Sequence, residues 1–309
     1  MRILLTGANG QVGWELSNRG GQRGLEVLAL NRSDLDITDP VSISNEVNRS
    51  AVSLVVNAAG YTAVDEAESE PELAFAANRD GPAYLASACG KAGIPLVHIS
   101  TDYVFDGQKQ EAYLVTDPVS PLSVYGKSKA AGEVEVRKHL REHFILRTGW
   151  VYGVHGHNFV KTMLRLGRER EEVQVVTDQY GCPTYAADLA ETILKIATQF
   201  LEGGQVYWGT YHYCGKGVIS WHGFAEEIFR LASEYASLKV KRVEPISTSE
   251  YPTPAQRPTS SILDCSVLAN TFNIHPQPWA KSLAHMLEVL FSIEKSKNPH
   301  RLSRKIETI

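Results

Sequence analysis

Residues 2–16 read Arg-Ile-Leu-Leu-Thr-Gly-Ala-Asn-Gly-Gln-Val-Gly-Trp-Glu-Leu, an apolar run that leads into three glycines. The apolar run predicts a strand over Arg2–Thr6, and the residues after the glycines have the spacing of a helix. Gly7 and Gly10 would let backbone N–H groups approach a pyrophosphate at the N-terminus of that helix, where the helix dipole favours anions. Gly13 would let the helix pack closely on the strand. The stretch therefore predicts a dinucleotide-binding turn, and a tight turn without a ligand is the alternative.

Four further β-rich runs follow in the first half of the chain, with helical patterns between them, one of them a helix over Pro71–Gly90. Several runs are continuously apolar, as in parallel strands that are covered on both faces. This alternation predicts an α/β fold with a doubly wound, parallel, Rossmann-like sheet. The expected strands are Arg2–Thr6, Glu26–Leu30, Leu54–Ala58, Leu96–Ser100 and Phe144–Arg147.

The pattern changes after Trp150, and the rest of the chain predicts a smaller C-terminal α/β substrate domain. The stretch Val243–Ser261 is rich in Pro, Ser and Thr and is expected to be an ordered loop without regular structure. Regular elements are expected at Val173–Thr177, Asp188–Phe200, Ser220–Leu231 and Pro278–Ile293. The expected domains are residues 1–150 for dinucleotide binding and mainly 151–294 for substrate binding, with the chain re-entering the first domain, before a polar tail over 295–309.

Composition excludes several classes of protein. The 309 residues carry 31 Lys+Arg against 35 Asp+Glu, a net charge of −4, whereas a nucleic-acid-coating protein would show a basic surplus. The four cysteines have no zinc spacing and are expected to be reduced thiols, and we expect no metal site. No apolar stretch approaches the roughly 20 residues of a membrane helix, and the N-terminus does not resemble a signal peptide. We therefore expect a soluble, cytoplasmic protein that does not bind a membrane.

The residues after the second expected strand bear on the choice of nicotinamide cofactor. Asn31 and Arg32 follow this strand, and an arginine here can pair with a 2′-phosphate, whereas an acidic residue would bind a ribose 2′-OH. This favours NADPH, and the nearby Asp34 and Asp36 leave NADH open. Asp36 and Ile37 are expected to flank the adenine.

Tyr125 and Lys129 lie four residues apart in a helical pattern, so they would share one face of the helix. A nearby ammonium lowers the pKa of a tyrosine from its usual value near 10, which suits the phenol to protonate a carbonyl oxygen. Ser100 and Thr101 end a central strand, where open α/β sheets bind ligands, and Thr148 ends the next. Any of these three hydroxyls could hold a substrate oxygen, or merely cap the strand ends.

Together these motifs resemble the extended short-chain dehydrogenase/reductase superfamily, and within it the dTDP-4-dehydrorhamnose reductase family. The resemblance is spread over most of the chain and is carried by collinear segments. They are residues 6–16, 56–68, 100–107, 125–129, 147–152, 158–163, 178–184 and 251–258.

The resemblance implies reduction of the C4 ketone of dTDP-4-dehydro-β-L-rhamnose, a nucleotide-diphosphate sugar, by NADPH or NADH. It implies that Tyr125 is the proton donor, that Lys129 binds the nicotinamide ribose and tunes Tyr125, and that Thr101 is the catalytic hydroxyl. Trp150 is similar to a tryptophan that packs on the sugar ring, whose 6-deoxy face is apolar. Further cofactor-binding candidates are Gly7, Gly10, Gln11, Val12, Ala58, Gly60, Tyr61 and Thr62, and further substrate-binding candidates are Asp102, Tyr103 and Asn158.

The substrate diphosphate needs a cationic or N–H partner, for which Arg257 is the first candidate and Lys161 the second, although either could be a surface charge. Two other functions stay open. One is a non-catalytic, NADP-binding subunit similar to the regulatory partner of methionine adenosyltransferase. The other is a related nucleotide-sugar epimerase or dehydratase, in which Asp102 would serve as an acid. The intact set of Thr101, Tyr125 and Lys129 favours an enzyme, and a homodimer also stays open.

Overall fold

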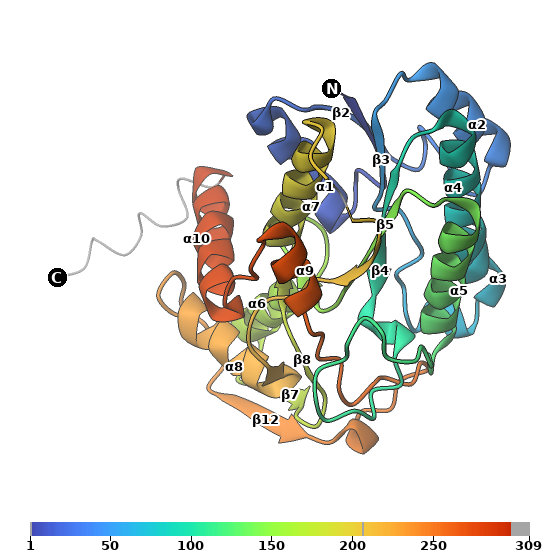
Figure 1. Cartoon of the computed structure of the whole chain (residues 1–309). Helices are drawn as coiled ribbons and strands as arrows, with labels where there is room; N and C mark the ends of the chain where they lie inside the picture. The colour runs from blue at the N-terminus through green and yellow to red at the C-terminus, as the bar shows by residue number, and fades with distance from the viewer. Residues whose placement is uncertain (1, 206, 298–309) are drawn as a thin grey trace.

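The computed structural model describes residues 2–205 and 207–297 (Figure 1). Within these residues, the largest sheet consists of β1 (Arg2–Thr6), β2 (Glu26–Leu30), β3 (Leu54–Asn57), β4 (Leu96–Thr101), β5 (His143–Thr148) and β10 (Gly209–His212). All its pairings are parallel, in the order β10-β5-β4-β3-β1-β2. The expected doubly wound parallel sheet is confirmed. Both bounds of each expected strand agree with the observed bounds to within one residue.

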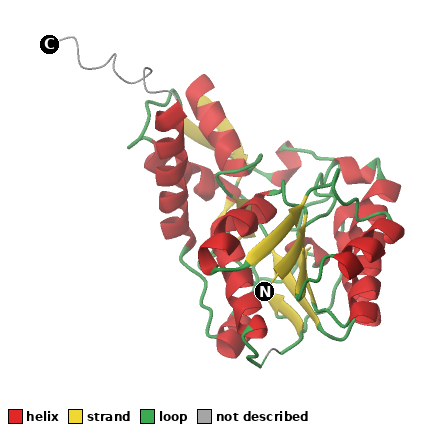
Figure 2. Ribbon diagram, turned by 90° about the horizontal axis from the view of Figure 1, so that it is seen from above, coloured by secondary structure: helices red, strands yellow, loops and turns green. Residues whose placement is uncertain are grey.

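Helices cover both faces of this sheet (Figures 1 and 2). Ile3 and Leu5 of β1 point to one face, where they pack with Leu16, whereas Leu4 between them packs on the other face with Val136. Both faces of the strand are buried, which explains its continuous apolar sequence. The first face carries α1 (Gln11–Gly20) and α7 (Ala186–Leu201), and the second carries α2 (Pro40–Arg49), α4 (Gly81–Ala92) and α5 (Val124–His139).

A second, smaller group of elements packs around its own apolar core, which includes Phe224 and Met286. Its strands pair two by two: β7 with β12 and β6 with β9 in parallel, and β8 with β11 antiparallel. The bounds are β6 (Val151–Tyr152), α6 (Phe159–Glu169), β7 (Glu172–Val176), β8 (Tyr180–Gly181), β9 (Thr184–Tyr185), β11 (Ile219–Ser220), α8 (Trp221–Ala232), β12 (Arg242–Ile246) and α10 (Trp279–Lys297). Helix α9 (Ser266–Phe272) packs instead against β10 and in the core of the large sheet.

The chain beyond residue 150 contributes to both groups, because β10 pairs with β5 and α7 packs on α1. The division of the chain at residue 150 remains a prediction. Helix α10 continues past the expected end at Ile293 to Lys297, and residues 298–309 of the expected tail lie outside the described residues.

The single helix expected over Pro71–Gly90 is wrong. The chain forms α3 (Pro71–Phe75), a π-helical turn (Ala76–Asp80) and then α4. Pro82 has no N–H to donate to the Asn78 carbonyl, so the regular hydrogen-bond pattern is interrupted there. The Asn78 carbonyl instead faces α5 so closely that a Cβ at Gly132 would lie 2.0 Å from its oxygen.

The expectation that Val243–Ser261 holds no regular structure is also wrong at its start. Residues Arg242–Ile246 form β12, which pairs along its length with β7, and Thr248–Glu250 form a short 3-10 turn. Pro245 is tolerated in this strand because β12 has a single neighbour, so its missing N–H interrupts no central ladder.

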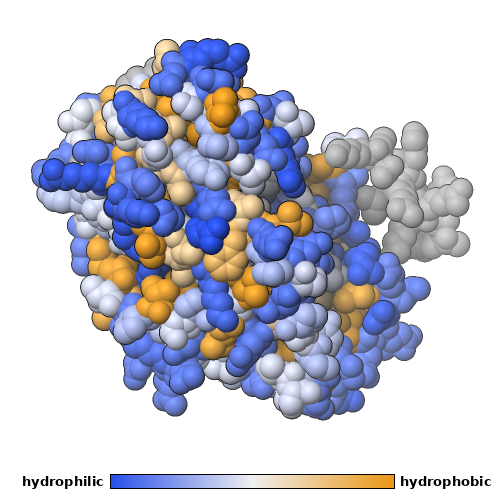
Figure 3. Space-filling model, turned by 90° about the vertical axis from the view of Figure 1, so that its right-hand side faces the viewer, coloured by the Kyte–Doolittle hydropathy of each residue, from blue (hydrophilic) through white to orange (hydrophobic). Residues whose placement is uncertain are grey.

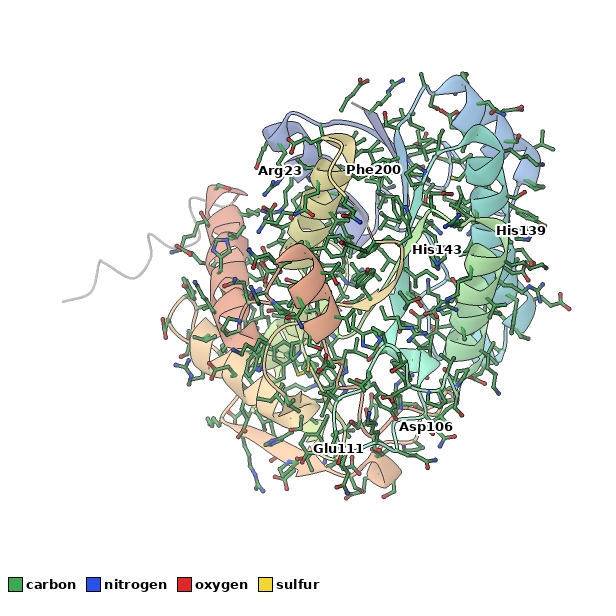
Figure 4. The ribbon with its side chains drawn as sticks, viewed as in Figure 1. Arg23, Asp106, Glu111, His139, His143 and Phe200 are labelled. Atoms are coloured by element: carbon green, nitrogen blue, oxygen red, sulfur yellow. The ribbon has the colours of Figure 1, made fainter. Side chains whose placement is uncertain are left out.

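Because the strands of the large sheet are parallel, their amino ends lie at one end of the molecule and their carboxyl ends lie at the other. Arg23, after α1, and Phe200, near the end of α7, lie at one end, and Asp106 and Glu111, which follow β4, lie at the other (Figure 4). The face over α3, α4 and α5 is largely hydrophilic, with scattered hydrophobic side chains (Figure 3). Helices of the length and apolarity that crossing a membrane requires are absent from the described part of the chain.

The close contact between α5 and the π-helical turn generates a stability prediction. We expect Gly132→Ala to lower the free energy of unfolding by about 1–3 kcal/mol, because the added Cβ meets a backbone carbonyl that cannot move aside cheaply. Denaturant unfolding followed by circular dichroism would measure it. Gly21→Ala is the matched control, since Gly21 has a helical φ of −60° and no atom within 4 Å of its added Cβ. Equal stability of the two variants would contradict the prediction.

Candidate active site

Two adjoining hollows lie at the carboxyl ends of β1, β3, β4 and β5, with volumes of about 490 and 740 Å³. Asn9, Gly10 and residues 58–62 line both, so together they form one elongated cleft. The sheet order reverses between β1 and β3, and ligands of open α/β sheets bind at such a switch point. The cleft therefore has the position and the length that a dinucleotide requires.

The middle of the cleft is formed by the N-terminus of α1. Gly10 caps this helix without a side-chain hydrogen bond, which leaves the first backbone N–H groups free to bind an anion. Gly7 has a φ of +72°, and a Cβ there would lie 2.5 Å from the Ala59 backbone nitrogen. A Cβ at Gly13 would lie 2.1 Å from the Gly7 carbonyl oxygen. The turn therefore fits the pyrophosphate of a dinucleotide, because only glycine, which has no side chain, leaves the backbone of this turn open to a ligand.

The smaller hollow is the adenosine end of such a cleft. Arg32 lines it with a side chain that is 86% exposed and lies 3.5 Å from Oδ2 of Asp36. Hydrogen bonds from Thr38 lower the pKa of Asp36, which keeps it ionised. Leu73 also lines this hollow, and its 55% exposure shows that it covers the hollow rather than the core. The sequence predictions missed Leu73, because its apolar spacing is also that of a core residue.

Tyr125, Lys129 and Thr101 come together in the larger hollow, the first two from α5 and the third from the end of β4. Lys129 Nζ donates a hydrogen bond to the Ile99 carbonyl, at 2.7 Å. Burial lowers the pKa of Lys129 to about 8. Burial also raises the pKa of Tyr125 to about 12, a rise that a hydrogen bond with Thr101 opposes and the Asp102 charge increases. The expected lowering of the Tyr125 pKa by Lys129 is therefore wrong for the protein alone, because desolvation of the phenolate has the largest effect on it and Lys129 is not among the groups that shift it.

The structure separates the three candidate hydroxyls at the strand ends. Ser100 donates a hydrogen bond to Glu133 at 2.6 Å, away from Tyr125. Thr148 Oγ1 is buried and has no hydrogen-bond partner within the described residues. Thr101 lines the larger hollow together with Tyr125 and is the hydroxyl that opposes the rise of the Tyr125 pKa, while its Oγ1 donates to Asp102 Oδ1 at 2.9 Å. This arrangement supports Thr101 as the hydroxyl beside the reacting oxygen.

Asp102 is buried at the rear of the larger hollow. Its Oδ1 accepts a hydrogen bond from Thr101 at 2.9 Å, and no described residue hydrogen-bonds its Oδ2. Burial raises the pKa of Asp102 to about 6. A Cβ at Gly149 would lie 2.4 Å from Oδ2, so the carboxyl group fits only against a glycine.

An aromatic wall of Trp150, Trp221 and Phe159 lines the opposite side of the larger hollow. Trp150 has a φ of +51°, and its ring stacks on Trp221 at a centroid distance of 3.4 Å and an angle of 3°. Its Nε1 donates to Ser261 Oγ at 3.1 Å, so the ring is held at its edge and on one face. The sequence predictions missed Trp221, because only the fold brings the start of α8 to Trp150.

Two of the predicted substrate-binding residues do not line either hollow. Asn158 caps α6 by accepting a hydrogen bond from the Lys161 backbone, and its Nδ2 donates to Gln11 Oε1 at 3.0 Å. Arg257 Nη2 pairs with Asp65 Oδ2 at 2.6 Å, beside the cleft. The Lys161 ammonium donates to backbone carbonyls of the loop before α6. These cationic and amide groups therefore bind other groups of the protein and do not line the cleft.

The remaining predicted residues all line the cleft. Tyr103 packs edge-on against Tyr125, with ring centroids 5.5 Å apart. The larger hollow is lined by Gly10, Gln11, Val12, Ala58, Gly60, Tyr61, Thr62, Thr101, Asp102, Tyr103, Tyr125, Lys129 and Trp150. The smaller hollow is lined by Gly7, Asn31, Arg32, Asp36 and Ile37, together with residues that the two hollows share.

Asn78, in the π-helical turn, is a site residue that the sequence predictions missed. It is fully buried, and its Oδ1 accepts a hydrogen bond from the Tyr61 backbone at 2.8 Å. Its Nδ2 donates to the Tyr61 carbonyl and to Ser128 Oγ, both at 3.0 Å. Asn78 thus joins the loop after β3 to the helix that carries Tyr125. A buried amide in an apolar helix would have been the available signal.

The four cysteines are free thiols, with Cys214 Sγ 3.7 Å from Cys265 Sγ. Groups of three or more His, Cys, Asp or Glu side chains arranged to share a metal ion do not occur in residues 2–205 and 207–297.

Comparison with known proteins gives one consistent family. The model of the family described as RmlD substrate binding domain matches residues 1–291. A dTDP-4-dehydrorhamnose reductase of Sinorhizobium fredii is 42% identical over 291 residues, which cover 94% of this chain and 98% of that protein.

Two solved structures agree with this match. The dTDP-4-dehydrorhamnose reductase of Clostridium acetobutylicum is 41% identical with a TM-score of 0.88, covering 94% of this chain and 99% of that one. The enzyme of Bacillus anthracis, solved in complex with NADP, is 39% identical with a TM-score of 0.86, covering 93% and 99%. The resemblance inferred from the motifs is confirmed: the chain belongs to the dTDP-4-dehydrorhamnose reductase family of NAD(P)H-dependent oxidoreductases.

Proposed function

We propose that this protein reduces the C4 ketone of dTDP-4-dehydro-β-L-rhamnose to give dTDP-L-rhamnose, with NADPH as its preferred cofactor. The observation that carries the proposal is the convergence of Tyr125, Thr101 and Lys129 in the hollow that adjoins the dinucleotide cleft. Family membership supports the reductase activity. The assignment of individual residues rests on the geometry of the cleft. A homodimer and a cytoplasmic location remain predictions from the sequence.

The residues of the cleft fit a nicotinamide dinucleotide along its whole length. The N-terminus of α1 would bind the pyrophosphate, and Lys129 would bind the nicotinamide ribose. Arg32 would pair with a 2′-phosphate, since its exposed guanidinium is held only loosely by Asp36. When bound, the cofactor supplies the hydride of the reduction.

The protein's own part of the reaction is to hold the ketone and supply one proton. The raised pKa of Tyr125 keeps the phenol protonated at neutral pH, so its proton is available. As negative charge develops on the ketone oxygen, Tyr125 donates that proton through its hydroxyl, and Thr101 holds the same oxygen. Lys129 then stabilises the tyrosine oxygen with its positive charge.

The sugar would lie between Asp102 and the aromatic wall. Asp102 would hold the Thr101 hydroxyl beside the sugar, and the Trp150 ring, which lines the larger hollow, would face the apolar side of a 6-deoxy sugar. We propose Arg257 for the diphosphate, because its positive charge lies close enough to Tyr103, in the lining of the larger hollow, to oppose the rise of the Tyr103 pKa. Asn158 would act indirectly, by holding Gln11 and the start of α6.

The proposal predicts a strict substrate requirement. Purified protein should consume NADPH only when a 4-keto-6-deoxy nucleotide sugar is present, which the loss of dihydronicotinamide absorbance would measure. The same sugar nucleotide with a hydroxyl group at C4 is the control and should give no consumption. Tight NADPH binding without turnover would instead favour a regulatory NADP-binding subunit and would overturn the proposal.

Removal of one phenolic hydroxyl should abolish most of the turnover. We expect Tyr125→Phe to lower kcat by about 10²–10⁴-fold, the usual contribution of a placed general acid, with little change in NADPH affinity. Steady-state kinetics and fluorescence titration with NADPH would measure both. Tyr84→Phe, which removes a hydroxyl from α4 outside the cleft lining, should be unaffected. A fully active Tyr125→Phe variant would remove Tyr125 from the mechanism.

The choice of cofactor should depend on one exposed cation. We expect Arg32→Ala to weaken NADPH binding about tenfold while changing NADH binding little, because only the first carries a 2′-phosphate for the guanidinium. Dissociation constants for both cofactors would measure the difference. Arg49→Ala, at the exposed end of α2, is the control of equal charge change. Equal losses for the two cofactors would show that Arg32 does not select between them.

A further inference from the structure

A buried carboxylate lies directly behind the catalytic lysine. Glu133 follows Lys129 by four residues on α5, so the two lie one helical turn apart on the same face, and Glu133 is 1% exposed. Its Oε1 accepts hydrogen bonds from Ser100 Oγ at 2.6 Å and Arg147 Nε at 2.8 Å. Its Oε2 accepts from Arg147 Nη2 and Arg137 Nη2, each at 2.7 Å. Each oxygen of this carboxylate therefore accepts two hydrogen bonds.

Two of these partners, Ser100 and Arg147, belong to the two strands that end at the active site. Ser100 directly precedes Thr101 on β4, and Arg147, which is 2% exposed, directly precedes Thr148 on β5. In a strand, neighbouring residues point to opposite faces, so a residue held on one face fixes the direction of the next. Through its two contacts, Glu133 thus sets how the end of β4 presents Thr101 towards Tyr125.

The charged groups around this carboxylate are few. Arg147 and Arg137 face it from β5 and α5, and they lower its pKa although burial raises it, so Glu133 stays ionised. The other titratable groups that face the lysine and this ion pair are His98 on β4, His212 on β10, His143 on β5, Tyr125 on α5 and Asp102 after β4.

Most of these neighbours do not change charge at mildly alkaline pH. Burial lowers the pKa of His98 and His143, and it lowers that of His212 to about 4, so all three are neutral there. Tyr125, with its pKa raised to about 12, stays protonated, and Asp102 stays ionised. The group that titrates is Lys129, whose pKa burial lowers to about 8 and the negative charge of Glu133 raises against that effect.

We propose that Glu133 is a positioning residue of the reaction: it fixes Thr101 relative to Tyr125 through Ser100, and its negative charge keeps Lys129 an ammonium ion in the cleft. The inference rests on the proposed function and names a residue outside the cleft lining. An ion pair that only stabilised the fold would affect unfolding and leave the protonation of Lys129 unchanged. The two roles can therefore be separated by a measurement on the lysine itself.

The first test measures the protonation of Lys129 without substrate or cofactor. The rate at which a small acetylating reagent modifies Lys129 is followed against pH by mass spectrometry of its peptide, since only the neutral amine reacts. In the unchanged protein the midpoint should lie near pH 8. In Glu133→Gln it should move to lower pH by at least about half a unit, because the ammonium loses the buried anion whose charge raises its pKa. An unmoved midpoint in folded Glu133→Gln would overturn the electrostatic part of the proposal.

Two further variants keep the test decisive. Glu135→Gln makes the same change two residues along α5, where the carboxylate forms ion pairs on the exposed side of the helix. This variant should leave the Lys129 midpoint unchanged. If Glu133→Gln does not fold, Arg137→Gln replaces it, since this arginine lies at the partly exposed rim of the ion pair. Its loss leaves the negative charge of Glu133 less compensated, so the Lys129 midpoint should move to higher pH. No movement would again overturn the proposal.

The second test concerns position rather than charge. Ser100→Ala removes the hydrogen bond to Glu133 and keeps the carboxylate, so the Lys129 midpoint should stay in place. We expect kcat to fall roughly tenfold with little change in the KM for NADPH, because Thr101 loses its fixed direction. An unchanged kcat would overturn the positioning role. If the proposed function were wrong, the wild-type protein would lack reductase activity, whereas Lys129 in it would still titrate at the expected pH.

Discussion

Contact between two stretches of backbone, the start of α1 and the end of β1, is the constraint on which the cleft depends. No side chain fits between them, since a Cβ at Gly13 would lie 2.1 Å from the Gly7 carbonyl oxygen. This contact brings the N-terminus of α1 to the point where the sheet order reverses, and it leaves the first N–H groups of the helix without side-chain partners. The position of the proposed pyrophosphate site, and of the two hollows that meet at Asn9 and Gly10, follows from this packing.

Within the larger hollow, burial has the largest effect on the pKa values of the three titratable groups. Desolvation raises the pKa values of Tyr125 and Asp102 and lowers that of Lys129, so the protein alone holds a protonated phenol beside a lysine that is easily neutralised. A proton donor for a ketone has to be protonated, as Tyr125 is. The residue that stabilises the resulting phenolate has to be positively charged, so the lowering of the Lys129 pKa by burial has to be opposed. Glu133 lies where it can make that correction, because its own charge is preserved by Arg147.

The second group of elements supplies the wall that faces this chemistry. Trp150 directly follows Gly149 in the turn after β5, and its ring is fixed by Trp221 from α8 and Ser261 from the segment after β12. Three parts of the chain that are far apart in sequence thus hold one indole ring. The loop before α6 is bound to the pyrophosphate turn through Asn158 and Gln11, so the sugar side and the cofactor side of the cleft are physically joined.

The sequence alone determined the parallel sheet, the glycine turn, the tyrosine–lysine pair and the family, because each depends on short-range spacing or on collinear motifs. Even the π-helical turn had a local cause in Pro82, although the apolar spacing over Pro71–Gly90 concealed it. Tertiary structure decided which of three hydroxyls meets Tyr125, in which direction its pKa moves and where Arg257 and Asn158 lie. It also brought Trp221, Asn78 and Glu133 to the site. Desolvation and contacts between distant segments depend on how the layers pack, and residue spacing along the chain does not contain that information.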